Sequence, residues 1–303
     1  MNGTEMTHDA YVIISPVRNE AAHLSHTIDS VVSQTLPPRL WVLVDDGSTD
    51  ATPSLIESAA KQHSWIRGIH RPDRGFRQAG GGVIQTFYDG YESLGQTAWD
   101  YIVKLDGDLS FEPTFFAQCL QHFGQDARLG IGGGTICHDV GGTLIQESCG
   151  DPPFHVRGAT KIYRRACWDG IGGLLKAPGW DTLDEVKANM LGWKTYTFPE
   201  LKLNHHRYAG DADGAWKNWV KNGRANYITG YHPLFMLCKF FSRLPEKPCG
   251  IAALALLWGF LSGYAKRIPR VNDPDLIRYL RDQQIRRLTL RSSLWSKNSL
   301  TPQ

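Results

Sequence analysis

Two aspartates at the end of an apolar run have the spacing that most directly predicts chemistry. Asp106 and Asp108, separated by Gly107, follow the run Tyr101-Ile-Val-Lys-Leu105, which predicts a buried strand. Residues two apart in an extended segment point to the same side, so both carboxylates can face one point beyond the strand. Two such carboxylates repel each other unless a divalent cation, Mn²⁺ or Mg²⁺, joins them to substrate phosphates. We therefore expect a metal site here, although an exposed acidic turn would have a similar sequence.

A second acidic cluster follows another predicted buried strand, residues 40–44. It reads Asp45-Asp46-Gly47-Ser-Thr-Asp50. A turn and a helix cap explain the last of these residues, but two adjacent acids exceed what a cap requires. A carboxylate at a strand end can accept a hydrogen bond from a ribose hydroxyl or from a base N–H. The cluster therefore predicts a nucleoside site.

The first predicted strand-to-helix turn has the sequence Pro16-Val-Arg-Asn-Glu20. A dinucleotide-binding fold would place G-x-G-x-x-G at this turn, and a P-loop would read G-x-x-x-x-G-K-[ST]; neither pattern is present. A nucleotide would therefore be held without a glycine-rich phosphate cradle. Farther along, residues 71–82 combine arginines with a glycine run before a helix, which suits an anion but is equally typical of a solvated loop.

Apolar runs alternate with segments of helical periodicity along the first 125 residues. We expect strands at residues 11–15, 40–44, 65–70 and 101–105, and helices at 22–32, 53–62, 83–94 and 113–123. This alternation predicts an α/β fold with a doubly wound, mostly parallel sheet, in which ligands bind beyond the carboxyl ends of the strands. The second half is less regular, with strands expected at 129–137, 160–164 and 193–198 and helices at 184–191 and 212–229.

The composition is that of an ordinary globular protein, with 303 residues of which 42% are apolar. Six scattered cysteines form no C-x-x-C pair, which predicts small buried residues in a reducing compartment. The first ten residues lack the apolar core of a signal peptide. The longest apolar stretch, Cys249 to Tyr264, is shorter than the roughly 20 residues of a membrane-spanning helix. We expect a cytoplasmic protein.

The order and spacing of these motifs resemble the inverting family-2 glycosyltransferases of the bacterial polysaccharide type, which have the nucleotide-diphospho-sugar transferase (GT-A, Rossmann-like) fold. The match rests on residues 16–20, 45–50, 74–75 and 106–108 and extends over residues 11–208. It implies transfer of a sugar from a UDP-, GDP- or dTDP-sugar to a hydroxyl of a saccharide or lipid-linked saccharide, with Mn²⁺ or Mg²⁺ as cofactor. Inversion requires attack on the anomeric carbon from the face opposite the leaving diphosphate.

The resemblance also implies which residues bind the donor and the metal. Nucleotide-sugar binding falls on Pro16, Val17, Arg18, Asn19, Glu20, Asp45, Asp46, Gly47, Arg74, Arg77, Lys104, Asp106 and Gly107. Metal binding falls on Asp106, Asp108 and a histidine after the following strand, which is His205 or His206.

The catalytic base is less well placed by the resemblance. The family usually carries a Glu-Asp pair about a dozen residues before a Gly-aromatic step, and here the Gly192-Trp193 step places Asp181 on the base. The residue before Asp181 is Trp180 instead of Glu. This departure leaves the base open between Asp181, Asp184 and Glu185.

The resemblance implies a catalytic domain at residues 1–210, with nucleotide-sugar binding at 11–125 and the acceptor side at 126–210, and a helical extension at 211–303. In the extension, two apolar segments, residues 231–241 and 249–264, precede a basic stretch. Apolar segments beside basic residues suit contact with a membrane surface, here the inner face of the cytoplasmic membrane, and packing on the catalytic domain or on another subunit is an equal alternative. Nucleic acid is not expected as a partner.

Two other functions would use a related sheet. A sugar-phosphate nucleotidyltransferase usually carries a Gly-rich loop containing Lys or Arg after the first strand, and residues 16–20 form no such loop. A non-catalytic nucleotide-sugar-binding protein would be expected to lose the acidic positions, and all of them are present. A glycosyltransferase is therefore the favoured interpretation.

Overall fold

The structure is a computed structural model that describes residues 10–73, 75, 81–148, 150–152, 154–207, 215–245 and 250–296. The strands are β1 Tyr11–Val17, β2 Leu40–Asp45, β3 Ile66–His70, β4 Tyr101–Leu105, β5 Leu109–Phe111, β6 Leu129–Val140, β7 Thr143–Gln146, β8 Thr160–Arg164 and β9 Lys194–His205. The helices are α1 Leu24–Val32, α2 Thr52–Gln62, α3 Gly81–Ser93, α4 Phe115–Gln125, α5 Arg165–Ile171, α6 Trp180–Met190, α7 Ala215–Ile228, α8 Pro233–Arg243, α9 Ile251–Ala265 and α10 Pro274–Leu288.

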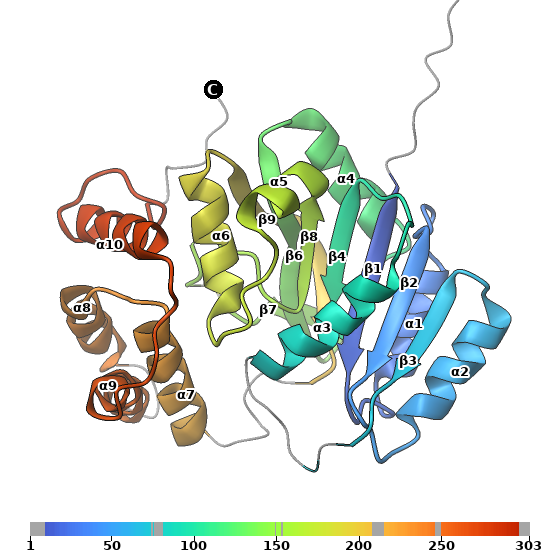
Figure 1. Ribbon diagram of the computed structural model, residues 1–303, viewed down its shortest axis with the longest axis horizontal. Coiled ribbons are helices and arrows are strands. Elements are labelled where there is room, and N and C mark those ends of the chain that lie inside the picture. Colours follow the sequence, from blue (N-terminus) through green and yellow to red (C-terminus); the bar gives the residue numbers. More distant parts are fainter. Residues whose placement is uncertain are drawn as a thin grey trace, which may run out of the picture.

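The strands form a sheet in the order β3-β2-β1-β4-β8-β6-β9-β5, with β7 paired to β6 (Figure 1). The first four strands are parallel, and each is followed by a helix or by an acidic turn at its carboxyl end. This confirms the prediction of a doubly wound α/β fold. The later strands add antiparallel pairs, since β8 runs against both β4 and β6.

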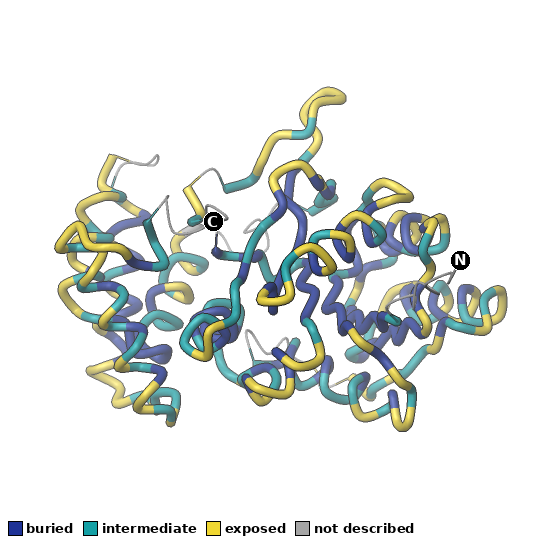
Figure 2. The backbone as a smooth tube through the Cα atoms, turned by 90° about the horizontal axis from the view of Figure 1, so that it is seen from above, coloured by how far each residue is buried: buried dark blue, intermediate teal, exposed yellow. Residues whose placement is uncertain are grey.

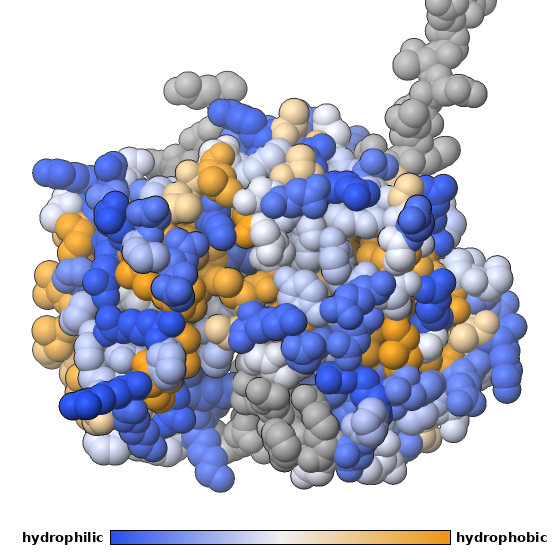
Figure 3. All heavy atoms as spheres, viewed as in Figure 1, coloured by the Kyte–Doolittle hydropathy of each residue, from blue (hydrophilic) through white to orange (hydrophobic). Residues whose placement is uncertain are grey.

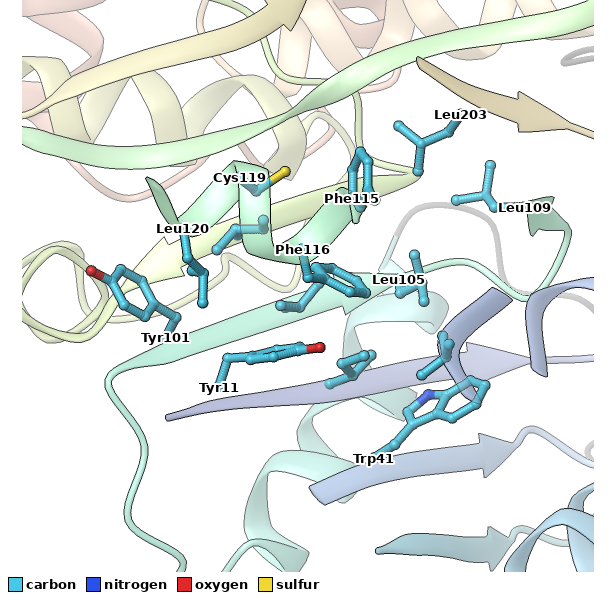
Figure 4. Packing of buried hydrophobic residues seen from close by; sticks show 14 of the residues in the cluster. Tyr11, Trp41, Tyr101, Leu105, Leu109, Phe115, Phe116, Cys119, Leu120 and Leu203 are labelled. Carbon is cyan, nitrogen blue, oxygen red and sulfur yellow. The ribbon is translucent and has the colours of Figure 1, made fainter. Parts of the chain in front are cut away.

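Alternation along the buried strands explains why helices cover both faces of the sheet. Tyr11 and Ile13 of β1 point into one apolar cluster with α1, α2 and α4, whereas Val12 and Ile14 point into another with α3, α5 and α6. In the first cluster, the ring of Phe116 on α4 lies 5.0 Å from that of Tyr11, over β1 and β4 (Figure 4). Fully buried strands of this kind are near-continuous apolar runs.

Three of the cysteines are small buried residues of this core. Cys119, Cys137 and Cys167 are buried and unpaired, as predicted. The prediction is wrong for Cys238, which is exposed on α8. The other two cysteines lie outside the described residues.

The four helices α7–α10 lie beside α6, at the end of the sheet opposite β3 (Figure 1), and confirm the predicted helical extension. A third apolar cluster joins them to α6 through Leu183 and Val186. Helices α7 and α9 are in close backbone contact, because a Cβ at Gly223 would lie 1.9 Å from the carbonyl oxygen of Leu256. Among the described residues, no helix has both the length and the apolar character needed to cross a bilayer.

Candidate active site

The acidic pair after β4 is held in place by the neighbouring strands. Lys104, almost fully buried, donates from Nζ to Oδ1 of Asp106 and to the carbonyl oxygen of Gly158. A Cβ at Gly107 would lie 2.6 Å from Cγ1 of Val17, so only glycine lets this turn pack on the end of β1. Burial raises the pKa of Asp106, against the opposing charge of Lys104. The predicted donor residues Lys104, Asp106 and Gly107 are therefore one packed unit.

The second carboxylate of the pair faces a histidine from β9. Oδ2 of Asp108 lies 3.4 Å from Nε2 of His205, and Nδ1 of His205 lies 2.7 Å from Oε1 of Glu147. Burial acts to raise the pKa of Asp108, but the hydrogen bond and charge of His205, with Arg207, bring it below its ordinary value. Burial acts to lower the pKa of His205, but the two carboxylates raise it to about 10.

The two adjacent histidines at the end of β9 have different surroundings. The ring of His206 stacks on that of His26 at 4.5 Å, and its Nε2 lies 2.9 Å from the hydroxyl of Ser110. Burial and the nearby histidines lower its pKa. Of the two histidines predicted as alternatives, His205 is therefore the one whose side chain contacts Asp108.

The residues present fit a divalent cation in their chemistry. Oδ1 of Asp108 is buried and has no hydrogen-bond partner among the described residues, so one hard oxygen of the pair is left for a further ligand. Asp106 and His205 flank this carboxylate. Within the described part of the chain, no three His, Cys, Asp or Glu side chains form a ready-made metal cluster. A cation bound here would need ligands from the substrate, as phosphates supply in many Mg²⁺ and Mn²⁺ sites.

The acids after β2 are ordered by nearby groups. Oδ1 of Asp45 accepts a hydrogen bond from the backbone N–H of Ser48, and its Oδ2 lies 3.3 Å from Nδ1 of His70. Asp46 accepts from Nη1 of Arg71 at 3.0 Å. Arg71 also contacts Asp89 on α3, so the cluster is connected to the helix that follows the arginine-rich segment.

Residues of the first turn are fixed against the same loop. The side chain of Arg18 donates to the carbonyl oxygen of Asp46 and to Oδ1 of Asp73. Asn19 has a φ of 53°, and its amide oxygen accepts from the backbone of Thr49. Asparagine tolerates this left-handed conformation better than most residues do. The first two predicted nucleoside-binding segments are thus brought together at the carboxyl ends of β1 and β2.

Other predicted donor residues lie around this loop. Glu20, in the loop after β1, forms an ion pair with Arg207, the residue after the two histidines. This ion pair joins that loop to the end of β9. Gly47 has a φ of 72°, and a Cβ there would lie 2.5 Å from the backbone of Asp73. Arg74 and Arg77, predicted to contact the donor, lie outside the described residues.

The three candidate bases lie on α6 in unlike environments. The helix begins at Trp180, earlier than the predicted residue 184, and this places Asp181 in its first turn. Asp181 is partly exposed, and no described residue donates a hydrogen bond to its carboxylate. Asp184 and Glu185, in the next turn, are 4% and 0% exposed.

Asp184 and Glu185 are both engaged in a buried ionic network. Lys161 of β8 lies 3.0 Å from Asp184 and 2.7 Å from Glu185. Tyr163 donates its hydroxyl proton to Asp184, and His155 lies 2.9 Å from Glu185. Burial raises the pKa of Asp184 to about 6, against the opposing charge of Lys161. Every one of these groups has a partner, as buried charges require.

Trp180 connects α6 to the acidic pair. The centre of its ring lies 5.6 Å from Nζ of Lys104 and 5.5 Å from Nζ of Lys161. Cations at this distance from an indole face are attracted to it. Because Lys104 also bonds to Asp106, the start of α6 and the acidic pair lie side by side.

Sequence reasoning missed Lys161, Glu147 and the role of Arg207. Lys161 lies in a predicted strand, but its partners are more than 20 residues away, on α6. Glu147 follows the short strand β7, which was not predicted. Only the position of Arg207 beside the two histidines was a usable signal.

Comparison with known proteins places these features in a family. Residues 12–166 match the family model Glycosyl transferase family 2. The chain is 29% identical over 117 residues to chondroitin synthase of Pasteurella multocida (strain Pm70), which covers 39% of this chain and 11% of that protein. It is 25% identical over 182 residues to EpsH of Bacillus subtilis (strain 168), which is named as a glycosyltransferase, covering 53% of this chain and 48% of that one. The chain thus spans less than half the length of these relatives.

Solved structures share the fold at low identity. The mannosyltransferase PcManGT from Pyrobaculum calidifontis, in complex with GDP-Man and Mn²⁺, superposes with a TM-score of 0.53 at 16% identity, over 93% of this chain and 76% of that one. TarS residues 1–349 of S. aureus, in complex with UDP-GlcNAc, gives a TM-score of 0.51 at 14% identity, over 91% and 81%. These likenesses identify the GT-A fold.

Proposed function

This chain belongs to glycosyl transferase family 2, and we propose that it is a glycosyltransferase that moves a sugar, with inversion, from a nucleotide-diphosphate sugar to an acceptor hydroxyl. The observation that carries this proposal is the meeting of three segments beyond the carboxyl ends of the strands. The acidic pair after β4, the nucleoside-binding loops after β1 and β2, and the start of α6 are joined there by Lys104, Trp180 and Arg207.

The donor side divides between two sets of residues. The nucleoside lies against the loops after β1 and β2, where Asp45 and Asp46 can accept from ribose hydroxyls or base N–H groups. A divalent cation held by Asp106 and Asp108, with His205 beside them, would neutralise the departing diphosphate. In support, Oδ1 of Asp108 is buried and no described residue hydrogen-bonds to it, and the fold-related mannosyltransferase binds GDP-Man with Mn²⁺.

The acceptor side needs a base, and Asp181 suits this role best. Its carboxylate has no hydrogen-bond donor among the described residues, whereas those of Asp184 and Glu185 are occupied by Lys161. In the reaction, the acceptor hydroxyl gives its proton to Asp181 as its oxygen bonds to the anomeric carbon. The bond from that carbon to the diphosphate oxygen breaks, and the diphosphate leaves with the electron pair on the opposite face.

We also propose that the acceptor is a saccharide or lipid-linked saccharide reached at a membrane surface. Exposed apolar side chains recur at positions 234, 237 and 241 of α8 and at its C-terminal cap, residue 244, and at positions 251, 254, 258 and 261 of α9. This spacing places each set on one helix face. Apolar side chains are visible at the molecular surface over this part of the chain (Figure 3). Such faces beside basic residues suit an interface between lipid and water.

A panel of nucleotide sugars tests the donor assignment. We expect one UDP-, GDP- or dTDP-sugar to raise the unfolding temperature of the protein, and to do so only with Mn²⁺ or Mg²⁺, because ligand binding to the folded state stabilises it. The measurement is a thermal unfolding scan with each donor, with and without the metal. If no donor shifts the unfolding temperature in either condition, the proposed activity is wrong.

A further inference from the structure

A pocket of about 370 Å³ opens between α7 and α9, outside the donor site. Two indoles, Trp216 and Trp258, line it together with three cations, Lys217, Lys221 and Arg224. None of the residues assigned to the donor or the metal takes part. The composition of the pocket, aromatic and cationic, is that of a site for an anion attached to an apolar group.

The three cations are not neutralised within the described residues. No carboxylate there lies within ion-pair distance of Lys217, Lys221 or Arg224. Nε of Arg224 is buried and has no hydrogen-bond partner in the part of the chain that the structure describes. Guanidinium groups and ammonium groups bind phosphate oxygens with charge-assisted hydrogen bonds. A phosphate in the pocket would supply the counter-charge for all three cations.

The pocket is continuous with the apolar face of α9. Trp258 is 62% exposed and belongs both to the pocket and to the exposed set of Ile251, Leu254 and Leu261 on the same helix. Trp216 is also exposed, at 47%. Tryptophan is enriched where an apolar phase meets water, because its ring is apolar and its N–H is polar. Charge and apolar surface therefore adjoin, as in a phosphorylated lipid.

One residue of the pocket lining is close in the sequence to the proposed base. Pro178 lines the pocket, and Asp181 follows three residues later in the first turn of α6. The intervening Gly179 packs at the end of α7, where an added Cβ would lie 2.5 Å from Cγ2 of Thr229, the residue after the helix, and 3.7 Å from the carbonyl oxygen of Ala225. Helix α7 supplies most of the pocket lining. The contact of Gly179 with the end of α7 therefore connects the pocket to the helix turn that carries Asp181.

We propose that this pocket binds the phosphate or diphosphate of a lipid-linked acceptor, with the hydrocarbon chain along the apolar faces of α8 and α9. The inference rests on the proposed glycosyltransferase function and specifies its acceptor. The pocket holds the charged linkage between lipid and sugar, and the sugar end extends toward Asp181. A free sugar or a neutral lipid lacks the anion for which the three cations are placed.

Direct binding of farnesyl diphosphate to the full chain tests this proposal, with the fluorescence of the tryptophans as the signal. We expect farnesyl diphosphate to bind, and farnesol or pyrophosphate alone to bind at least roughly tenfold more weakly, because each lacks half of the ligand. In Lys217→Gln/Lys221→Gln, two exposed positions whose loss leaves the core intact, affinity for farnesyl diphosphate should fall roughly tenfold. The affinity for farnesyl diphosphate should also fall in Arg224→Gln, which tests the third cation of the pocket independently.

Two controls separate this proposal from the activity itself. Lys61→Gln/Arg278→Gln removes the same charge from exposed positions outside the pocket and should bind farnesyl diphosphate like the unmodified chain. Binding of UDP or GDP with Mn²⁺ should be unchanged in all variants. Equal binding of farnesyl diphosphate by the pocket variants and the control, or equal binding of farnesol, would overturn the pocket assignment while leaving the donor site untouched. Equal binding of pyrophosphate would do so as well.

Discussion

Asp181 is the proposed base because no described residue donates a hydrogen bond to its carboxylate, whereas those of Asp184 and Glu185 are engaged. It lies one residue after Trp180, whose ring is 5.6 Å from Nζ of Lys104. Asp184 and Glu185 are bound by Lys161 in a buried network, where the charge of Lys161 stabilises both carboxylates. Removing one member of such a network leaves an uncompensated buried charge.

Asp181→Asn should leave donor binding nearly unchanged but lower the transfer rate by about 10²–10⁴-fold, since the amide cannot accept the proton of the acceptor. Initial rates of nucleoside diphosphate release with acceptor, together with calorimetry of donor binding, measure the two effects separately. Asp184→Asn and Glu185→Gln are the matched comparisons, and we expect them to lower the unfolding temperature instead. A selective loss of transfer in either of these, with Asp181→Asn active, would assign the base elsewhere.

At the scale of elements, the contact between α7 and α9 holds the pocket walls together. A Cβ at Gly259 of α9 would lie 2.1 Å from the carbonyl oxygen of Val220, so the two backbones approach as closely as glycine allows. Close backbone contact between helices requires small residues at the crossing. The same crossing brings Trp258 next to the cations of α7.

Gly259→Ala should therefore reduce the free energy of unfolding by about 1–3 kcal/mol, because the added methyl group forces the helices apart. Gly124→Ala is the control, since glycine at this position of α4 has nothing within 4 Å of the added Cβ. Alanine there should be neutral or stabilising by about 0.5–1 kcal/mol, through its higher helix propensity. Urea unfolding of both variants measures these changes. Equal stability of Gly259→Ala and the unmodified chain would contradict the packing of α7 on α9.

Apart from the short strand β5, the elements of the first 125 residues could be predicted one by one because their strands are largely buried and their helices are amphipathic. Strand β5 and helix α5 were missed because three and seven residues are too few to show a period. Strand β9 continues past residue 198 to His205 through a bulge near Pro199, where the apolar pattern breaks. The sequence therefore indicated the two histidines but not the strand that carries them.

The parts of the candidate site that consist of short sequence motifs could be predicted. The parts that depend on contacts between residues far apart in the sequence could not. The acidic clusters and the first turn were found because adjacent acids at a strand end exceed what a turn needs. The engagement of Asp184 and Glu185 by Lys161 could not be found, because β8 and α6 meet only in the folded chain. Glu147, which contacts His205, comes from a hairpin with no chemical signature in its sequence.

At the scale of the whole molecule, the C-terminal helices are distinguished by the apolar side chains that they expose. The outward faces of the C-terminal helices are exposed (Figure 2), and they carry large apolar side chains such as Phe241 and Leu254, which are 58% and 53% exposed. Two apolar helix faces next to each other exceed the scattered apolar residues of an ordinary surface. This arrangement favours attachment in the plane of a membrane interface.

The full chain should co-sediment with anionic vesicles more than with neutral ones, because each basic residue near an anionic leaflet adds about 1 kcal/mol. Added salt should weaken the preference for anionic vesicles, because it screens charges, and should leave the binding contributed by the apolar side chains unchanged. Leu254→Ser/Leu261→Ser, at two exposed positions of α9, should lower sedimentation with both vesicle types. If the full chain sediments with neither anionic nor neutral vesicles, these helix faces contact another protein, and a soluble acceptor becomes the better assignment.

The central claim is that the acidic pair binds a nucleoside diphosphate through a divalent cation, and calorimetry of UDP and GDP with and without Mn²⁺ tests it most directly. Asp108→Asn removes one charge and leaves one hard oxygen instead of two at the residue whose Oδ1 has no partner within the described residues. The account predicts Mn²⁺-dependent binding in the unmodified chain and in Asp29→Asn, an exposed control on α1, with loss of that binding in a folded Asp108→Asn variant. Unchanged, metal-dependent affinity of Asp108→Asn for the diphosphate would contradict it.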